Sequence, residues 1–197
     1  MKKHTLLLVF LLVAYCLNAW VKTGSVFIAT KSEHDKIKSE PTEMEVFVDS
    51  VKTMSKRLDV PHKWVLALCY NESMFKHDAK NPKSTATGII QFTAGTALKL
   101  GTSVEAIRKM SCTEQLRYVE KYLRIGIDKY GKYQSVTDLY LWCLLPDMRL
   151  HCNEPSYVIM EKGDKYYHLN YGLDTNGDGL ILVKEISQRM QKKLKSF

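Results

Sequence analysis

The sequence predicts a mainly α-helical protein with a smaller segment of different character at its C-terminus. Apolar residues recur every three to four positions through most of residues 43–146, which is the spacing of helices that bury one face. Helix-capping patterns precede several of these stretches. After Pro146 the helical spacing gives way to a short strand-like run and a loop. With 197 residues, of which 45% are hydrophobic, the chain is long enough for one domain with a buried core and short extensions.

The N-terminus has the pattern of a targeting segment. A basic start at positions 2–4 precedes an apolar stretch that ends near Trp20 and is too short for a comfortable membrane span. We therefore expect residues 1–20 to be a signal peptide or an N-terminal anchor, with a lipid on Cys16 as an alternative. The protein would be exported and periplasmic or associated with the cell envelope, either membrane-anchored or secreted. Residues 21–42, rich in Lys, Ser and Glu, predict a linker.

Net charge narrows the class of partner. The chain carries 29 Lys and Arg against 21 Asp and Glu, a formal net charge of +8. A basic surface suits an anionic polymer or an anionic membrane. The basic residues are spread along the chain, and no nucleic-acid-binding motif is present. We expect a solvated basic surface and no nucleic-acid partner.

Four cysteines remain once Cys16 is set aside. An even number in an exported protein permits disulfides. Cys69 lies on the apolar face of a helix, which favours a buried free thiol. Cys143 and Cys152 flank Pro146 and could pair. No cysteine spacing is typical of a zinc site.

Local signals divide the helical region. Helical spacing begins at Met44, and Pro61 suits the first turn of a second helix that ends in Glu72. The polar stretch 76–87 predicts a loop. Two short helices follow over 93–100 and 104–110. Ser111 opens a capping box for a long helix to about Tyr130, and residues 135–138 resemble a second cap, which opens an apolar helix that Pro146 ends.

The remaining residues have a different texture. A strand is expected over 157–160, an irregular segment over 166–172 and a helix over 183–194. There is no internal repeat. The predicted organisation is therefore one helical domain over 43–146, followed by a C-terminal extension over 147–197.

Glu72 is the first candidate for chemistry. On a helix, positions i, i+3, i+4 and i+7 share a face, so Glu72 shares one with Val65, Leu68 and Cys69. A carboxyl group among apolar side chains loses hydration when it is charged, which raises its pKa. Such a group can stay protonated near neutral pH and donate a proton to a glycosidic oxygen. The alternative is that Glu72 is the last exposed residue of a fraying helix.

A set of short motifs surrounds this glutamate. Glu72 and Ser73 with Phe75 are followed by residues 88–92 (Gly-Ile-Ile-Gln-Phe), then by Thr-Ala at 96–97 and Leu-Gly at 100–101. This order resembles the catalytic core of the lysozyme-like (SLT-type) lytic transglycosylases, and Phe92 after the Gln looks most like the phage tail-associated variant. The resemblance implies a lysozyme-like α-helical fold and cleavage of the MurNAc–GlcNAc β-1,4 bond of peptidoglycan.

The resemblance also implies roles for individual residues. Glu72 matches the family's catalytic acid and base, and its product would carry a 1,6-anhydro-MurNAc end. Ser73 matches a serine that supports the reacting sugar, although a hydroxyl at a helix C-terminus often bonds nearby backbone instead. Gly88 matches a glycine that lets the backbone approach substrate. Gln91 matches a glutamine that lines the glycan cleft. Phe92 is expected in the core.

One family segment is missing. Many members carry Ala-Tyr-Asn-x-Gly with a substrate-binding tyrosine, whereas residues 139–146 here are Leu-Tyr-Leu-Trp-Cys-Leu-Leu-Pro. Tyr140 or Trp142 could substitute, and both also suit a core. Tyr140 is therefore a candidate for substrate binding.

A hydrolytic muramidase is the nearest rival enzyme. It often uses a second carboxylate to activate water or to stabilise the cation. Asp78, Glu105 and Glu114 are candidates, but Asp78 is better explained as a loop acid and Glu114 as a helix cap. With no second acid at a persuasive spacing, the sequence favours a mechanism with a single glutamate.

A second motif occupies residues 174–185. It matches the twelve-residue calcium loop D-x-[DN]-x-[DN]-G-x5-E at every defined position. The expected ligands are Asp174, Asn176, Asp178, the backbone carbonyl of Leu180, and Glu185. No clear helix precedes this loop, so we expect a solitary EF-hand-like site with a structural Ca²⁺. The resemblance implies no cofactor for catalysis.

Together these observations predict a monomer that acts on peptidoglycan glycan strands, with possible membrane association through its N-terminal segment. A non-catalytic wall-binding protein and a purely structural calcium-binding protein stay open as alternatives.

Overall fold

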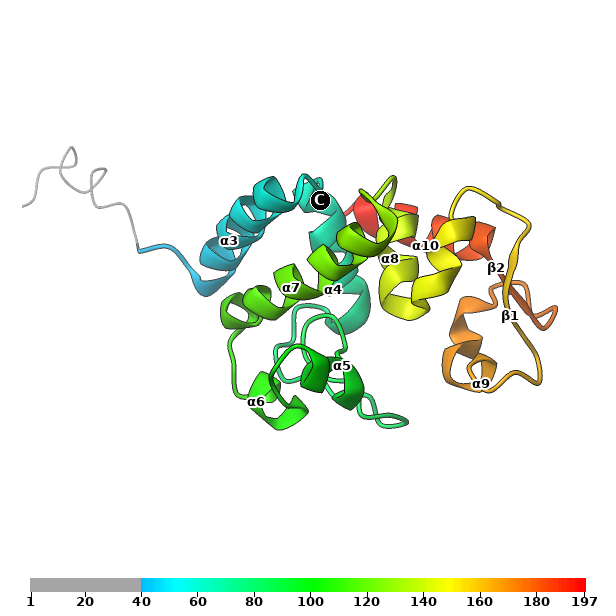
Figure 1. The fold of residues 1–197 in the computed structure, drawn as a ribbon, viewed down its shortest axis with the longest axis horizontal. Coiled ribbons are helices and arrows are strands. Elements are labelled where there is room, and N and C mark those ends of the chain that lie inside the picture. The colour runs from blue at the N-terminus through cyan, green and yellow to red at the C-terminus, as the bar shows by residue number, and fades with distance from the viewer. Residues whose placement is uncertain (1–39) are drawn as a thin grey trace, which may run out of the picture. The chain divides into compact units, whose positions relative to one another are not determined.

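The computed structural model describes residues 40–197, and residues 41–197 form one compact unit. The expected export segment and most of the expected linker lie outside the described residues. The elements of the described part are α3 (Glu43–Leu58), α4 (His62–Ser73), α5 (Ala94–Lys99), α6 (Val104–Arg108), α7 (Cys112–Tyr130), α8 (Val136–Leu144), η1 (Pro146–His151), β1 (Val158–Glu161), α9 (Tyr167–Asn170), η2 (Tyr171–Leu173), β2 (Leu180–Leu182) and α10 (Val183–Leu194). The prediction of a mainly helical fold is confirmed (Figure 1).

Side-chain caps lie at the helix N-termini that the sequence predicted. Ser111 forms a capping box with Glu114 at the start of α7. The Ser135 hydroxyl accepts a hydrogen bond from the Asp138 backbone N–H at the start of α8. These bonds satisfy N–H groups that have no partner within the helix. The helices predicted over the N-terminal half are thus confirmed, with boundaries within a few residues.

Helix α4 lies at the centre of the unit. It packs against α3, α8 and α10. Four of its residues, Val65, Ala67, Leu68 and Cys69, are completely buried. Figure 1 shows α4 among these helices, with α10 beside α8 at the red end of the colour scale. Burial of its central turns holds α4 in place, and its C-terminal end carries Glu72.

The C-terminal segment combines a two-stranded sheet with short helices. Strands β1 and β2 pair antiparallel, with Met160 opposite Ile181. The predicted strand and C-terminal helix are confirmed as β1 and α10. The prediction of an irregular segment over 166–172 is wrong in detail, because this stretch forms α9 and η2. Its helical turns have no side-chain cap and bury little, so apolar spacing did not reveal them.

A buried ion pair joins the end of α7, α8 and η1. The Arg149 guanidinium donates to both carboxylate oxygens of Asp138, at 2.5 and 3.1 Å, and both side chains are only 3% exposed. Its remaining N–H groups donate to the carbonyl oxygens of Gly126, Gly131 and Lys132. Because each guanidinium nitrogen has an acceptor and the two charges face each other, this pair can be buried without an unpaired charge.

The cysteines of the described part are free thiols. Cys69 is completely buried, as predicted. The pairing of Cys143 with Cys152 is not seen. The two thiols lie in different surroundings, because Cys143 is near Glu72 and Cys69 whereas Cys152 is near Asp138 and Arg149. Among residues 40–197, no helix combines the length and the hydropathy needed to cross a bilayer.

The Arg149–Asp138 pair gives a stability prediction. Replacing Arg149 with Met leaves the Asp138 carboxylate buried without its partner, and we expect the free energy of unfolding to fall by about 3–5 kcal/mol. Urea denaturation followed by circular dichroism measures this change. The control is Lys52→Met, which removes the exposed pair with Asp49 and should leave the curve unchanged. Equal denaturation curves for Arg149→Met and wild type would contradict the conclusion that the buried pair of Arg149 and Asp138 stabilises the fold.

Candidate functional site

Glu72 lies in the last turn of α4, one residue before the helix ends at Ser73. Met74 and Phe75 follow with φ angles of 52° and 62°, so two consecutive residues adopt the left-handed conformation. Residues other than glycine rarely adopt this backbone conformation, because it costs energy and needs support from surrounding contacts. The Phe75 ring supplies that support by packing against Phe47 and Tyr70. The sharp turn stops the helix directly after the acid.

The Glu72 carboxyl group is half-buried and has a raised pKa. Burial is the largest influence and raises the pKa from 4.5 to about 7. A hydrogen bond from Asn71 Nδ2 to Glu72 Oε1, 3.1 Å long, opposes this rise. The charge of Arg189 and the Tyr140 side chain act in the same direction as Asn71. The result is a carboxyl group that carries a proton for part of the time near neutral pH, as the apolar face of the helix predicted.

Helix α8 brings further groups to Glu72. Tyr140 is only 5% exposed and lies beside both Glu72 and Asn71. Burial raises the pKa of the Tyr140 phenol, so its hydroxyl group keeps its proton. Cys143, one turn later on α8, is also near Glu72, and burial raises the pKa of its thiol. Of the two candidates on this helix, Tyr140 therefore lies next to the acid.

Ser73 ties the end of α4 to the loop that follows. Its buried hydroxyl lies 3.1 Å from the carbonyl oxygens of Cys69 and Ile89, and it donates to them. The bond to Cys69 lies within the helix, whereas the bond to Ile89 crosses to the Gly-Ile-Ile-Gln motif. In this position the hydroxyl holds the motif against the helix that carries Glu72.

The loop itself forms a small hairpin. Thr87 makes isolated bridges with Lys80 and Phe92, and its hydroxyl donates to the Ala79 carbonyl. Gln91 has a φ of 56°, and its side-chain nitrogen donates to the Gly88 carbonyl at 3.0 Å, which closes the turn between them. Phe92 is 2% exposed, so the expectation that it belongs to the core is confirmed.

Gln115 on α7 holds this loop in place, and the sequence analysis missed it. Its side chain is completely buried. Its oxygen accepts from the Ile89 backbone N–H, and its nitrogen donates to the carbonyl oxygens of His77, Ile107 and Met110. An uncharged polar residue on the buried face of a helix was the available signal, since such a group needs partners.

Gly88 is needed where the loop meets Gln115. Its φ is +80°, and an added Cβ would lie 2.4 Å from Gln115 Oε1. Any other residue would be strained and would push against the side chain that anchors the loop.

The candidates for a second acid are not among the groups that shift the pKa of Glu72. Glu114 caps α7, as expected. Glu105 and Asp78 are exposed, in the first turn of α6 and in the loop. The groups that shift the Glu72 pKa are the uncharged Asn71 and Tyr140 and the cationic Arg189.

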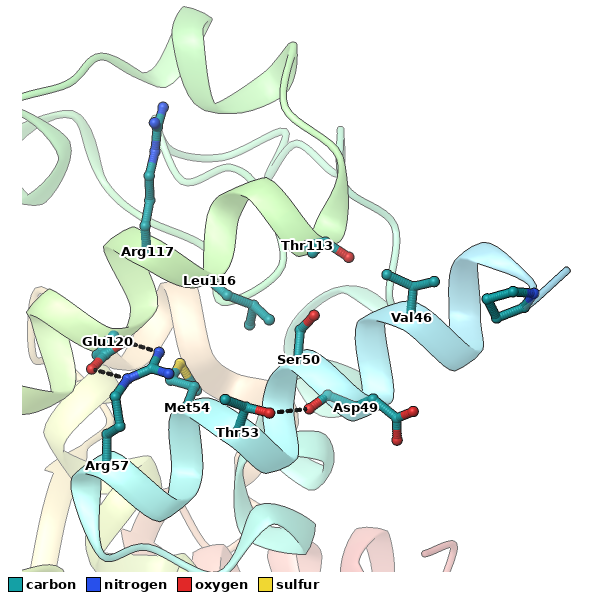
Figure 2. A pocket seen from close by; sticks show the side chains of 11 residues that line it. Val46, Asp49, Ser50, Thr53, Met54, Arg57, Thr113, Leu116, Arg117 and Glu120 are labelled. Carbon is teal, nitrogen blue, oxygen red and sulfur yellow. Dashed lines mark hydrogen bonds and ion pairs between the residues drawn. The ribbon is translucent and has the colours of Figure 1, made fainter.

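A groove of about 550 Å³ lies between α3 and α7 (Figure 2). In it Arg57 donates to both carboxylate oxygens of Glu120, and Thr53 donates to the Asp49 carbonyl. Glu72, Gln91 and Tyr140 are not among its lining residues. Because its main charged groups are paired with each other and no pKa there is raised toward neutrality, we do not assign the chemistry to this groove.

The predicted calcium loop has an orderly backbone. Asp174 at position 1 accepts hydrogen bonds from the N–H groups of Gly177 and Gly179, and Gly179 has a φ of +88°. Glu185 at position 12 accepts from the N–H groups of Thr175 and Leu182. These bonds close the loop on itself. Strand β1 pairs with the loop's own strand β2, where a paired EF-hand would present a second loop.

The donor set suits calcium in its chemistry. Asp174, Asp178 and Glu185 all act on the nearby Tyr167 hydroxyl by their charge. Glu185 is 2% exposed, and no basic side chain among residues 40–197 forms an ion pair with it. Its carboxylate accepts hydrogen bonds from the Thr175 and Leu182 N–H groups and from the Thr175 hydroxyl, and such oxygen donors are those that calcium prefers. Within the same range, no group of three or more Asp, Glu, His or Cys side chains converges as a metal site.

Comparison with known proteins bears on the helical part of the chain. No curated protein matches the chain. Residues 49–143 match the family model described as the transglycosylase SLT domain, a segment that includes Glu72, the loop motif and Tyr140. The match supports a lysozyme-like domain, peptidoglycan as the substrate and action on the cell wall. Residues 49–143 are thus similar to the transglycosylase SLT domain, whose members are lytic transglycosylases, and this similarity indicates lytic transglycosylase activity on peptidoglycan in general.

Proposed function

We propose that this protein cleaves the MurNAc–GlcNAc β-1,4 bond of peptidoglycan with Glu72 as both acid and base, and leaves 1,6-anhydro-MurNAc ends. The observation that carries the proposal is the half-buried Glu72 carboxyl group, whose pKa of about 7 keeps it partly protonated at neutral pH. A general acid works best when its pKa is close to the working pH. The match of residues 49–143 to the transglycosylase SLT domain supports the same chemistry.

The proposed reaction has two proton transfers. Glu72 first gives its proton to the glycosidic oxygen while the bond from that oxygen to C1 of MurNAc breaks. The resulting Glu72 carboxylate then takes the proton of the MurNAc 6-hydroxyl group, whose oxygen forms the new bond to C1. The acid ends as it began, protonated, and no water is consumed. One carboxyl group is sufficient for this sequence.

The surroundings of Glu72 favour this mechanism over hydrolysis. A hydrolytic muramidase often places a second carboxylate across the scissile bond. Here the groups that act on Glu72 are Asn71, Tyr140 and Arg189, none of which is acidic. The hydrolase stays the alternative enzyme, and a non-catalytic wall-binding or structural calcium-binding protein is the alternative without catalysis.

Other residues would support the acid. Tyr140 would contact substrate through its protonated hydroxyl group beside Glu72. Gln91 would line the glycan cleft from the loop, and Gly88 would let that loop pack closely. Ser73 would act on the reacting sugar by holding the Ile89 backbone against α4. The phage tail-associated variant remains our proposal for the subtype.

We also propose that residues 174–185 bind a structural Ca²⁺ through Asp174, Asn176, Asp178, the Leu180 carbonyl and Glu185. Support comes from the complete motif, the hydrogen bonds that close the loop and the buried Glu185 carboxylate within it. The bound ion would neutralise this carboxylate at the start of α10.

The protein would be an exported monomer, in the periplasm or cell envelope.

Glu72→Gln tests the catalytic role. The amide has nearly the same shape but donates no acidic proton, so release of soluble fragments from purified sacculi should fall by about 10²–10⁴-fold. The matched control is Glu105→Gln, an exposed acid that should keep full activity. Thermal melting of Glu72→Gln should be unchanged or higher at pH 8, because the amide avoids the cost of a buried charge. Full activity of Glu72→Gln would contradict the proposal.

The raised pKa predicts the pH dependence. Glu72 must be protonated to act first as an acid, and its pKa in the free enzyme is about 7. Values of kcat/KM should therefore decrease as the pH rises through about 7, by tenfold per unit on the alkaline side. Turbidity loss of sacculi between pH 5 and 9 provides the measurement. A profile that is flat to pH 9 would show that no group of this kind limits the reaction.

Calcium binding predicts a thermal shift. A ligand that binds only the folded state stabilises it by about 2.7 kcal/mol at a hundred times its dissociation constant, so added Ca²⁺ should raise Tm. Asp178→Ala removes an exposed predicted ligand and should abolish the rise, whereas Glu161→Gln on the neighbouring strand should retain it. A Tm that ignores Ca²⁺ and chelator in the wild type would rule out the site.

A further inference from the structure

Helix α10 lies against the helix that carries Glu72, although it comes more than a hundred residues later in the chain. Its residues Ile186 and Met190 are completely buried, and α10 packs against both α4 and α8. At the far end of α10, the Lys193 ammonium lies 4.9 Å from the centre of the Tyr70 ring. Helix α10 therefore contacts α4 through its buried face and through Lys193.

The C-terminal residue extends this contact. The Phe197 ring packs edge-on against Tyr70 and Phe75, with ring centres 6.0 and 5.9 Å apart. Phe75 belongs to the left-handed turn that ends α4. Phe197 thus packs against the turn that follows Glu72.

A chain of hydrogen bonds connects Arg189 to the acid. Arg189 Nε donates to Asn71 Oδ1 at 2.8 Å, and Asn71 Nδ2 donates to Glu72 Oε1 at 3.1 Å. An amide has one oxygen and one nitrogen, so a donor on one side decides which atom faces the other side. Because Arg189 can only donate, the Asn71 oxygen must face it, and the Asn71 nitrogen must then face Glu72.

We propose that Arg189 is a positioning residue that fixes the Asn71 amide and thereby the orientation of the Glu72 carboxyl group. Arg189 lies outside the segment that matches the transglycosylase SLT domain, so the family match does not supply this role. The inference rests on the proposed function for its effect on activity, but the contact chain itself can be tested without substrate.

Arg189 also balances the burial of the acid. The groups that face Glu72 are Cys69 and Asn71 from α4, Tyr140 and Cys143 from α8, and Arg189 from α10. Burial keeps the thiols and the phenol in their neutral forms. Arg189 is therefore the charged group of this set at neutral pH, and its positive charge favours the Glu72 carboxylate. Without Arg189, the rise of the Glu72 pKa that burial causes would be opposed less, and the pKa would be higher.

Two substitutions separate charge from geometry. Arg189→Met removes both the charge and the directed N–H group. Arg189→Lys keeps a charge but replaces the planar donor by a compact ammonium on a flexible stem. Lys192→Met is the matched control, because it removes a positive charge from an exposed position of the same helix.

The experiment is a carboxyl ¹³C NMR titration of the full chain, with Glu72→Gln used to assign the Glu72 signal. Arg189→Met should raise the Glu72 pKa by about 0.5–1 unit, since an opposite charge has been removed from its surroundings. The alkaline limb of the kcat/KM profile should move upward by the same amount. The value of kcat should decrease by about 10- to 100-fold, because small misplacements of a reacting group are costly. Arg189→Lys should keep the pKa near that of the wild type and still lower kcat, and Lys192→Met should change neither.

A double-mutant cycle tests the path through Asn71. If Arg189 acts through that amide, Asn71→Ala combined with Arg189→Met should lower kcat little more than Asn71→Ala alone. An unchanged Glu72 pKa and an unchanged pH limb in Arg189→Met, with a normal Tm, would overturn the proposal. Should Arg189→Met fail to fold, Arg189→Lys and Asn71→Ala decide, because wild-type kcat in both would also overturn it. A pKa rise in Arg189→Met together with full activity of Glu72→Gln would instead refute the proposed function and leave the contact chain in place.

Discussion

The site depends on the balance that sets the pKa of Glu72. Burial of its carboxyl group raises this pKa, and a few neighbouring groups lower it by favouring the charged form. Burial alone would hold this group protonated, and a group that never releases its proton cannot later act as a base. Asn71, Tyr140 and Arg189 oppose burial, and the pKa settles at about 7. Asn71 belongs to α4, Tyr140 to α8 and Arg189 to α10. The pKa of Glu72 therefore depends on how these three helices pack against one another.

The packing of α4 explains why this arrangement can be rigid. Its central residues are completely buried, so the helix cannot shift without opening cavities in the core. The turn after Ser73 is held by the Phe75 ring, and the loop beyond it by the Ser73 hydroxyl and by Gln115. The loop motif therefore reaches the site through backbone contacts, while the acid reaches it through the end of a buried helix.

Local order could be predicted from the sequence, whereas contacts between distant segments could not. Helix starts depend on neighbours three residues apart, so the caps at Ser111 and Ser135 and the buried face of Cys69 and Glu72 were predictable. The bond between Arg189 and Asn71 joins residues 118 positions apart, and nothing in the spacing of either residue points to the other. The same holds for Gln115, whose partners lie on two other segments. The prediction for residues 166–172 was wrong for a different reason. The short helical turns there bury too few residues to produce helical spacing of apolar residues.

In the proposed reaction the oxygen of the new bond to C1 comes from the sugar itself, and the most direct test is to digest sacculi in H₂¹⁸O. Mass spectrometry of the released fragments should show 1,6-anhydro ends that lack one water and carry no ¹⁸O, because the MurNAc 6-hydroxyl group attacks C1. Reducing ends that carry one ¹⁸O would show that water is the nucleophile. That result would contradict the single-glutamate transglycosylase and identify a hydrolytic muramidase.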